Sequence, residues 1–303
     1  MNTLPRRHVD KERVFATCVL LLPVILFFCL FLARPLITSI VYSFMKVEVM
    51  RGGVKTTLIW LDNFREILKD KVFLKAAQNT ITWAIASPLL EIPLGLLLAL
   101  ALKSKIYGSR FFRAVWFAPV LMPQVVVGII WSWLLNAEWG LVNRILSGIG
   151  LESMTQAWLG KSDTALGSLI FITTWVWTGF NMVLMMTAVS TVSDDVLEAA
   201  RIDGASYWRS VWNIILPIIK PMVINALILC FIGKMKVYDL IYVTTKGGPA
   251  WATETVATYT VKRAFNWSFI ERGYPSAMAT LWFLIILVVT VLSNRAVKNS
   301  YLE

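Results

Sequence analysis

The chain has 303 residues, of which 57% are hydrophobic and only 16% are charged, so it is far more apolar than an ordinary soluble domain. Its 29 Lys and Arg residues outnumber 18 Asp and Glu residues, for a formal net charge of +11. These basic residues divide about evenly between the two expected faces and form no patch of the kind that binds nucleic acid. The composition therefore excludes a soluble domain and favours an integral membrane protein that contacts lipid and no nucleic acid.

Six segments are long and apolar enough to form membrane-spanning helices, because about 18 apolar residues cross the hydrocarbon layer of a bilayer. In chain order they are residues 14–33, about 76–102, 114–137, 164–193, about 215–237 and 273–294. The second is interrupted by Glu91, and the fifth begins with Lys220. We therefore expect an all-α integral membrane domain over residues 14–295, with short tails at 1–13 and 296–303.

The first apolar segment is expected to be retained in the mature chain. It is longer than the core of a signal peptide and lacks a small-residue cleavage site. Six crossings place both termini on one side of the membrane, and the even division of Lys and Arg does not select that side. The densest basic cluster without acids falls on the side of the termini and favours a cytoplasmic location for both. Its members are Lys103, Lys105, Arg110 and Arg113.

Local signals predict two further features of the bundle. Between the first two spans, Asp62 is placed to begin a short amphipathic helix on the outer surface. Pro88 and Pro93 lie in the second span, and Pro119 and Pro123 lie in the third. Because proline removes a backbone donor, kinks are expected in both spans. Such kinks either open space for a cavity or serve as static packing features.

The chain lacks the residues that ATP hydrolysis or metal chemistry would require. It contains no G-x-x-x-x-G-K-[ST] sequence, and GGVKTT at 52–57 has the wrong spacing. The single histidine, His8, lies in the N-terminal tail, which argues against a histidine-ligated metal and a Ser-His-Asp triad. Cys18, Cys29 and Cys230 lie in apolar helix without paired spacing. We therefore expect no catalytic residue, metal or cofactor on this chain, and no enzyme activity.

A compact polar block, residues 193–217, separates the fourth and fifth spans. Ser193 is placed to cap a helix, and Asp194 and Asp195 fall in its first turn, where the helix dipole favours carboxylates. The alanines that follow leave room for close approach by another surface. Gly204 permits a bend that a residue with a β-carbon would resist. The block therefore reads as a short helix and a turn that re-enter the membrane domain.

The spacing inside this block is specific. Glu198, Ala199 and Ala200 are followed by Gly204 after three residues, and then by Ile214, Leu216 and Pro217. This pattern resembles the EAA signature of the membrane subunits of binding-protein-dependent ABC importers, and every signature position is present. A re-entry helix whose small residues only allow packing is the alternative, but the full spacing between two spans favours the signature.

The resemblance implies a fold and a coupling mechanism. In that family the signature faces the cytoplasm and forms a coupling helix that docks into a groove of an ATPase subunit. We therefore expect an importer-permease (MetI-like) bundle with a cytoplasmic coupling helix. The residues expected to contact the ATPase are Glu198, Ala199, Ala200, Asp203 and Gly204.

Four other segments are similar to the sugar-importer branch of this family, namely residues 61–68, 78–85, 112–135 and 236–255. The similarity covers about residues 55–295, and Lys234 departs from it as an additional cation. It implies alternating access for a carbohydrate, such as an oligosaccharide or sugar derivative, in the bacterial cytoplasmic membrane. The implied partners are a second homologous permease, two ATPase subunits that hold ATP and Mg, and an external solute-binding protein.

Polar side chains in apolar spans are expensive in lipid and usually face a cavity or another protein. The candidates for the substrate pathway are Asn79, Gln124, Asn181, Asn225, Lys236, Tyr238 and Asp239. Amides, carboxylates and aromatic faces suit a neutral sugar. Each candidate also has a structural interpretation, because amides bridge helices and Lys236 and Asp239 are spaced to pair. For Glu91, the structural interpretation is a bond to a backbone group or to the partner chain.

Three other functions compete with sugar import. Lys234 and Lys236 would suit an ABC importer permease for an anion such as a sugar acid or glycerol phosphate. An ion-coupled secondary transporter would also be a polar-lined bundle, but it needs coupling-ion sites and usually a longer, repeated topology. A membrane enzyme would need a nucleophile with a base, or a metal constellation, near one interface. The sequence favours the sugar importer over all three.

Overall fold

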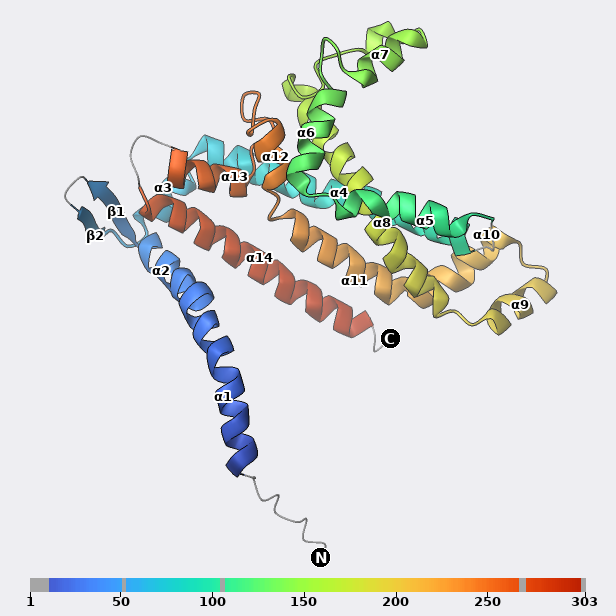
Figure 1. The fold of residues 1–303 in the computed structure, drawn as a ribbon, viewed down its shortest axis with the longest axis horizontal. Coiled ribbons are helices and arrows are strands. Elements are labelled where there is room, and N and C mark those ends of the chain that lie inside the picture. The colour runs from blue at the N-terminus through green and yellow to red at the C-terminus, as the bar shows by residue number, and fades with distance from the viewer. Residues whose placement is uncertain (1–10, 51–52, 104–106, 267–270, 301–303) are drawn as a thin grey trace, which may run out of the picture.

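The computed structural model describes residues 11–50, 53–103, 107–266 and 271–300, which form a helical bundle with one small hairpin (Figure 1). Over these residues, five helices are long and apolar enough to cross a membrane, or up to six if one bent helix pair counts as a single span. The predicted fold class is thereby confirmed. Residues 11–13 and 296–300, expected in the tails, belong to the first and last helices. The rest of both tails, His8 and Lys105 lie outside the described residues.

The spans follow one another in the predicted order. The first comprises α1 (Lys11–Phe28), η1 (Cys29–Ala33) and α2 (Arg34–Ser43). The second is α4 (Lys71–Lys103), and the third predicted span corresponds to the bent pair, with α5 (Ser109–Phe117), η2 (Ala118–Leu121) and α6 (Gln124–Leu134). The last three are α8 (Ser162–Ser190), the combination of α10 (Tyr207–Ser210), η4 (Val211–Ile215) and α11 (Leu216–Lys234), and α14 (Gly273–Ser300).

Shorter elements connect the spans. They are the strands β1 (Met45–Met50) and β2 (Gly53–Leu58), and the helices α3 (Asp62–Ile67), α7 (Leu141–Gly148), η3 (Glu152–Met154), α9 (Asp194–Ile202), α12 (Asp239–Thr244), α13 (Val256–Val261) and η5 (Lys262–Asn266). The two strands pair antiparallel, with Met45 opposite Leu58. The predicted helix at Asp62 is present as α3, but Asp62 forms an exposed ion pair with Arg65 and no side-chain cap bond.

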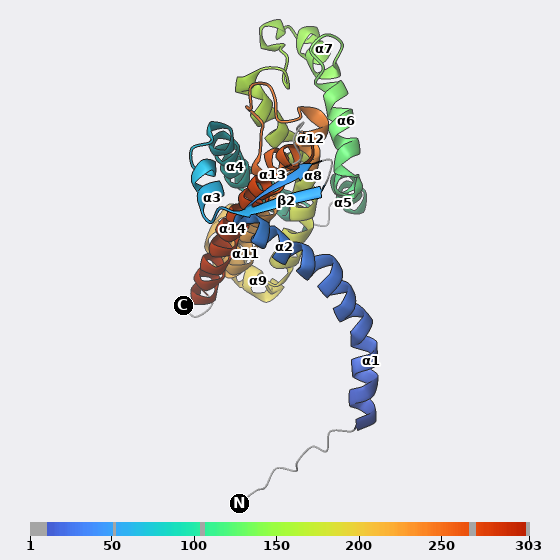
Figure 2. The same ribbon diagram turned by 90° about the vertical axis from the view of Figure 1, so that its left-hand side faces the viewer.

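The first span is longer than predicted, and most of its surface is uncovered. The apolar window ended before Arg34, yet the helix continues to Ser43, because a single arginine does not interrupt backbone hydrogen bonding. None of its most apolar 18-residue window is buried, and α2 packs against α14 while α1 extends away from the bundle (Figures 1 and 2). This span therefore leaves a large apolar surface for lipid or another chain.

The two proline pairs have different outcomes. The third span bends by 101° between η2 and α6, as Pro119 and Pro123 predicted. Met122 is extended there, with ψ of 137°, because a residue that precedes proline is pushed out of the helical region. The second span, in contrast, stays one α-helix through Pro88 and Pro93. Pro88 is buried in this helix, which packs along α8, so tertiary contacts hold the helix together at that point.

The centre of the bundle is the packed pair of α4 and α8. At Gly95, an added β-carbon would lie 2.8 Å from the backbone carbonyl carbon of Asn181, so close helix packing requires glycine there. Ile92, Met185 and Ala226 form an apolar cluster that joins this pair to α11. This packing brings the polar residues of α4, α8 and α11 to one shared cavity.

Candidate functional site

A cavity of about 450 Å³ opens between α4, α6, α8, α11 and the segment that leads into α12. Five of the seven sequence-predicted pathway residues line it, namely Gln124, Asn181, Lys236, Tyr238 and Asp239. They come from three helices and one connecting segment, so the fold gathers side chains that are far apart in the sequence. Apolar residues, among them Trp177, Phe180 and Leu184, complete most of the wall.

A buried ion pair forms the polar part of this wall. The Nζ atom of Lys234 lies 2.6 Å from Oε1 of Glu91 and 3.4 Å from Oγ1 of Thr173. The same ammonium lies 5.0 Å from the centre of the Trp177 ring, within the range of a cation–π contact. Glu91 is 0% exposed and Lys234 is 7% exposed, so their charges compensate each other with little help from solvent.

This pair was not predicted from the sequence. Glu91 was expected to bind a backbone group or a partner chain, and Lys234 was noted as a departure from the sugar-importer branch and as a cation suited to an anionic substrate. The structure pairs the two through the contact between α4 and α11. The sequence did contain one signal for this pair, since it places one carboxylate and one additional ammonium in apolar spans. A buried charge in a membrane protein usually pairs with an opposite charge.

Asn181 connects the ion pair to the rest of α8 and α11. Its Nδ2 donates to the carbonyl of Trp177 at 3.1 Å and to Oε2 of Glu91 at 3.4 Å, while its Oδ1 accepts from Sγ of Cys230 at 3.5 Å. The side chain is 1% exposed. Asn181 therefore both contributes to the cavity wall and bridges helices. The pathway interpretation and the structural interpretation from the sequence are thus compatible for this residue.

The rim of the cavity is more exposed and carries both signs of charge. Lys236 and Asp239 are exposed, and the described residues contain no ion pair between them. Tyr238 stacks on Tyr242 with ring centres 5.2 Å apart and an interplanar angle of 20°. Desolvation, with smaller contributions from Tyr242 and Asp239, raises the pKa of Tyr238 above its usual range. The rim thus presents a neutral phenol, an ammonium and a carboxylate side by side.

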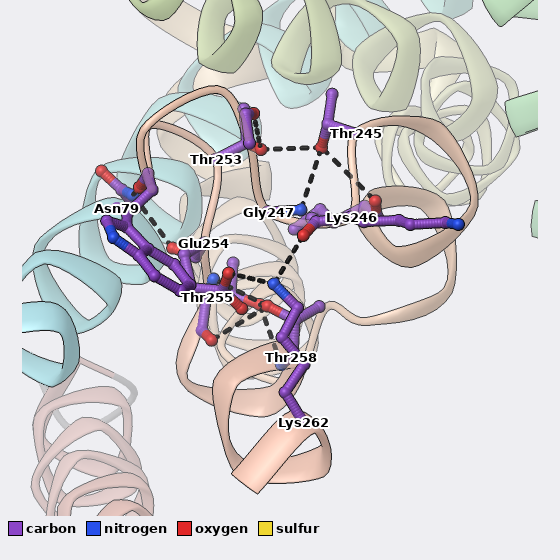
Figure 3. A network of polar contacts seen from close by, with 12 residues as sticks. Asn79, Thr245, Lys246, Gly247, Thr253, Glu254, Thr255, Thr258 and Lys262 are labelled. Atoms are coloured by element: carbon purple, nitrogen blue, oxygen red, sulfur yellow. Dashed lines mark hydrogen bonds and ion pairs between the residues drawn. The ribbon is translucent and has the colours of Figure 1, made fainter. Parts of the chain in front are cut away.

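The two remaining pathway candidates lie elsewhere. Asn225 lines an adjoining cavity of about 480 Å³, which shares Phe180 and Leu229 with the first. Asn79 lines neither of these cavities. Its Nδ2 donates to the carbonyls of Trp251 and Glu254, both at 2.9 Å, so it anchors the loop at 245–255 to α4 (Figure 3).

Hydrogen bonds and an ion pair hold that loop, residues 245–255, in place (Figure 3). The fully buried Glu254 forms an ion pair with Lys262, whose ammonium lies 5.3 Å from the centre of the Trp251 ring. Thr255 caps α13, and its Oγ1 also donates to the carbonyl of Val237 at 3.2 Å, directly beside the cavity wall. The loop is therefore fastened both to α4 and to the mouth of the cavity.

The polar block forms the predicted short helix, α9, and lies at the end of the bundle opposite the hairpin (Figure 1). Ser193 occupies the N-cap position with extended backbone, although its side chain makes no cap bond. Gly204 has a φ of +77° directly after the helix, so the bend inferred from the sequence is confirmed. Glu198, Ala199 and Asp203 are exposed while Ala200 is buried, which leaves a polar helix face open to a partner.

Comparison with known proteins places this geometry in a family. The family model for the binding-protein-dependent transport system inner membrane component matches residues 91–301 of this chain. The probable ABC transporter permease protein YurN of Bacillus subtilis is 33% identical over 276 residues, which cover 90% of this chain and 93% of that protein. The trehalose/maltose transport system permease protein MalF of Thermococcus litoralis is 33% identical over 77% of each chain.

A solved structure agrees with the fold. The crystal structure of a bacterial ABC transporter involved in the import of the acidic polysaccharide alginate matches with a TM-score of 0.81 and 23% identity, and the match covers 95% of this chain and 96% of that one. The family model spans more than half of the chain and includes both the EAA block and most of the cavity wall. The chain therefore belongs to the family of binding-protein-dependent transport system inner membrane components, the permease subunits of ABC importers.

Proposed function

We propose that this permease moves a neutral carbohydrate, such as an oligosaccharide or sugar derivative, across the bacterial cytoplasmic membrane. The observation that carries the proposal is the cavity, because amide, hydroxyl and charged groups line it together with the aromatic side chains of Trp177 and Tyr238. Sugar rings bind through hydrogen bonds to their hydroxyls and through apolar contact of their faces with aromatic rings. Relatives named as a trehalose/maltose permease and a diacetylchitobiose permease support this substrate class.

The charge of the cavity favours a neutral substrate over an anion. Its charged lining residues are Glu91, Lys234, Lys236 and Asp239, which is two negative and two positive charges with a formal sum of zero. The ammonium of Lys234 is already neutralised by Glu91 at 2.6 Å. An anionic sugar would therefore meet one exposed cation and one exposed anion at the rim, and no net attraction.

The rest of the transport machinery follows from the same proposal. A second homologous permease would complete the cavity and pack against α1, and an external solute-binding protein would deliver the sugar to the outer loops. Two ATPase subunits would bind ATP and Mg and dock on α9 through Glu198, Ala199, Ala200, Asp203 and Gly204. The chain itself would hold no cofactor and would alternate between outward and inward access, with both termini in the cytoplasm.

Uptake by the complete assembly tests the substrate class. Proteoliposomes with the native subunits are expected to accumulate a labelled neutral oligosaccharide from a panel that includes maltose, trehalose, diacetylchitobiose and glucuronate, with dependence on internal ATP. Tyr238→Ala is expected to lower this uptake about tenfold, because one stacking surface is worth ~1 kcal/mol or more. Tyr107→Ala removes a fully exposed tyrosine and serves as the matched control.

The same experiment separates the competing functions. Preference for glucuronate would replace the neutral-sugar proposal with an importer for acidic substrates. Uptake that follows an ion gradient and ignores ATP would support a secondary transporter. Equal uptake by the Tyr238→Ala and Tyr107→Ala variants would remove the aromatic rim from the substrate path.

A further inference from the structure

A second cleft, of about 740 Å³, has residues 30–42 of the first span on one side and residues 260–265 and 272–279 on the other, and it shares no lining residue with the transport cavity. It contains two arginines, Arg34 and Arg272, together with the hydroxyl groups of Thr38, Ser39 and Ser276. Both arginines are exposed. The described parts of α2 and α14 therefore form a cationic site that the transport pathway does not use.

Neither guanidinium takes part in an ion pair or hydrogen bond within the described chain. The neighbouring Glu271 forms an ion pair with Arg263, with 3.6 Å between Oε2 and Nη2. Arg34 lies within the apolar span that ends at Ser43, nine residues or roughly 14 Å from that end along the helix. An unpaired cation in a membrane-spanning helix is costly unless a ligand, a partner or snorkelling toward the interface compensates it.

The cleft is polar at one end and apolar along its length. Arg272 directly precedes α14 and Ser276 lies in its first turn, whereas Ala279 lies one turn, or roughly 5 Å, beyond Ser276 along this helix. On the opposite wall, Leu30 continues the groove past Arg34 into the most apolar part of the first span. An occupant that complements both parts must join an anionic head to an apolar chain.

We propose that this cleft binds an anionic phospholipid, with Arg34 and Arg272 as ligands of its phosphate. A guanidinium offers paired N–H donors that match two oxygens of one phosphate group, and the neighbouring hydroxyls supply further donors. The apolar wall then holds an acyl chain, which a free phosphate ion would leave uncovered. A carboxylate from another subunit would satisfy the charges but would leave the apolar lining residues, among them Leu30, Phe265 and Ala279, without a partner.

Lipid exchange on the intact transporter tests the site. The complete assembly would be placed in nanodiscs of phosphatidylcholine with increasing phosphatidylglycerol, and bound lipid would be counted by native mass spectrometry. We expect Arg34→Gln with Arg272→Gln to lower retention of phosphatidylglycerol by roughly 10- to 30-fold, because two phosphate contacts are lost. Arg144→Gln with Lys161→Gln removes two exposed charges elsewhere and is expected to keep wild-type retention.

Three other outcomes would overturn the proposal. Equal retention by both double variants would mean that the cleft holds no specific lipid. Loss of the second permease from the Arg34/Arg272 variant, with lipid content unchanged, would assign the cleft to a protein interface. Displacement of the lipid by millimolar inorganic phosphate would show that the arginines select a free anion. Retained assembly and uptake in the variant would confirm that the protein has folded.

Discussion

The Glu91–Lys234 pair allows a stability prediction with a defined sign for each variant. Glu91→Gln leaves the Lys234 ammonium without its carboxylate, and Lys234→Met leaves the carboxylate without its ammonium. Both groups are nearly inaccessible, with side chains 0% and 9% exposed. Removal of one partner from a buried pair typically costs about 3–5 kcal/mol, because the remaining charge is uncompensated. We expect each single variant to be destabilised by that amount.

The double variant is expected to recover most of this loss. Glu91→Gln with Lys234→Met removes both charges and keeps similar side-chain volumes, a change that is often neutral or stabilising in buried pairs. The coupling free energy between the two positions should therefore approach the sum of the two single losses, about 6 kcal/mol or more. The exposed pair of Asp62 and Arg65, with side chains 64% and 74% exposed, is the matched control. Its coupling is expected to stay below ~0.5 kcal/mol.

Reversible unfolding in mixed micelles of dodecylmaltoside and sodium dodecyl sulfate provides the measurement, with uptake assayed on the same four proteins. Single variants within ~1 kcal/mol of wild type, or a double variant equal to the sum of the two singles, would refute the assignment of a buried compensated pair. If stability returns in the double variant while sugar uptake does not, the pair also contacts the substrate.

Three more predictions concern other positions. Gly95→Ala should cost about 1–3 kcal/mol in the same unfolding assay, since its new methyl group would overlap the backbone of α8, whereas Gly167→Ala meets open space and should be close to neutral. Glu198→Arg should reduce co-purification of ATPase subunits with the tagged assembly, and the same reversal at Asp194, outside the EAA signature, should not; equal loss in both would assign the effect to general charge. Burial raises the pKa of Asp70, but hydrogen bonds from two tyrosines and two backbone amides outweigh it and hold the pKa below its ordinary value of 3.8. The stability from Asp70 is thus present above pH ~4 and is lost as pH falls through the lowered folded-state pKa, so Asp70→Asn should lose on the order of 2 kcal/mol at pH 7 and approach wild type near pH 2; a constant difference across this range would contradict the reasoning.

The spans could be predicted from the sequence because apolar length alone decides membrane insertion. Their ends were less certain. Arg34 closed the first apolar window, yet the helix runs to Ser43, because backbone hydrogen bonds depend little on one side chain. The hairpin at 45–58 was not expected either. Strand-forming residues such as Val54 next to a glycine such as Gly53 are nevertheless typical of a β-hairpin.

The candidate site was only partly predictable. Residues such as Gln124, Asn181 and Asp239 were chosen because they are polar in apolar surroundings, and the fold does bring them to one cavity. The same criterion also selected Asn79, which instead anchors backbone carbonyls of the loop at 245–255. Polarity identifies side chains that need partners, but only tertiary packing decides whether a substrate, another side chain or the backbone becomes that partner.

The order already present in the loop at 245–255 lowers the entropic cost of docking another protein on it. Docking usually loses about 0.5–1.5 kcal/mol for each flexible side chain that becomes immobile at an interface. In this loop, Trp251, Glu254 and Thr255 already have fixed neighbours before any encounter. Left-handed backbone at Lys246, with φ of +50°, and at Trp251, with φ of +63°, is likewise imposed during folding of the chain itself. A protein that docks on this surface therefore meets a preorganised site, and little of its interaction energy is lost to ordering the loop.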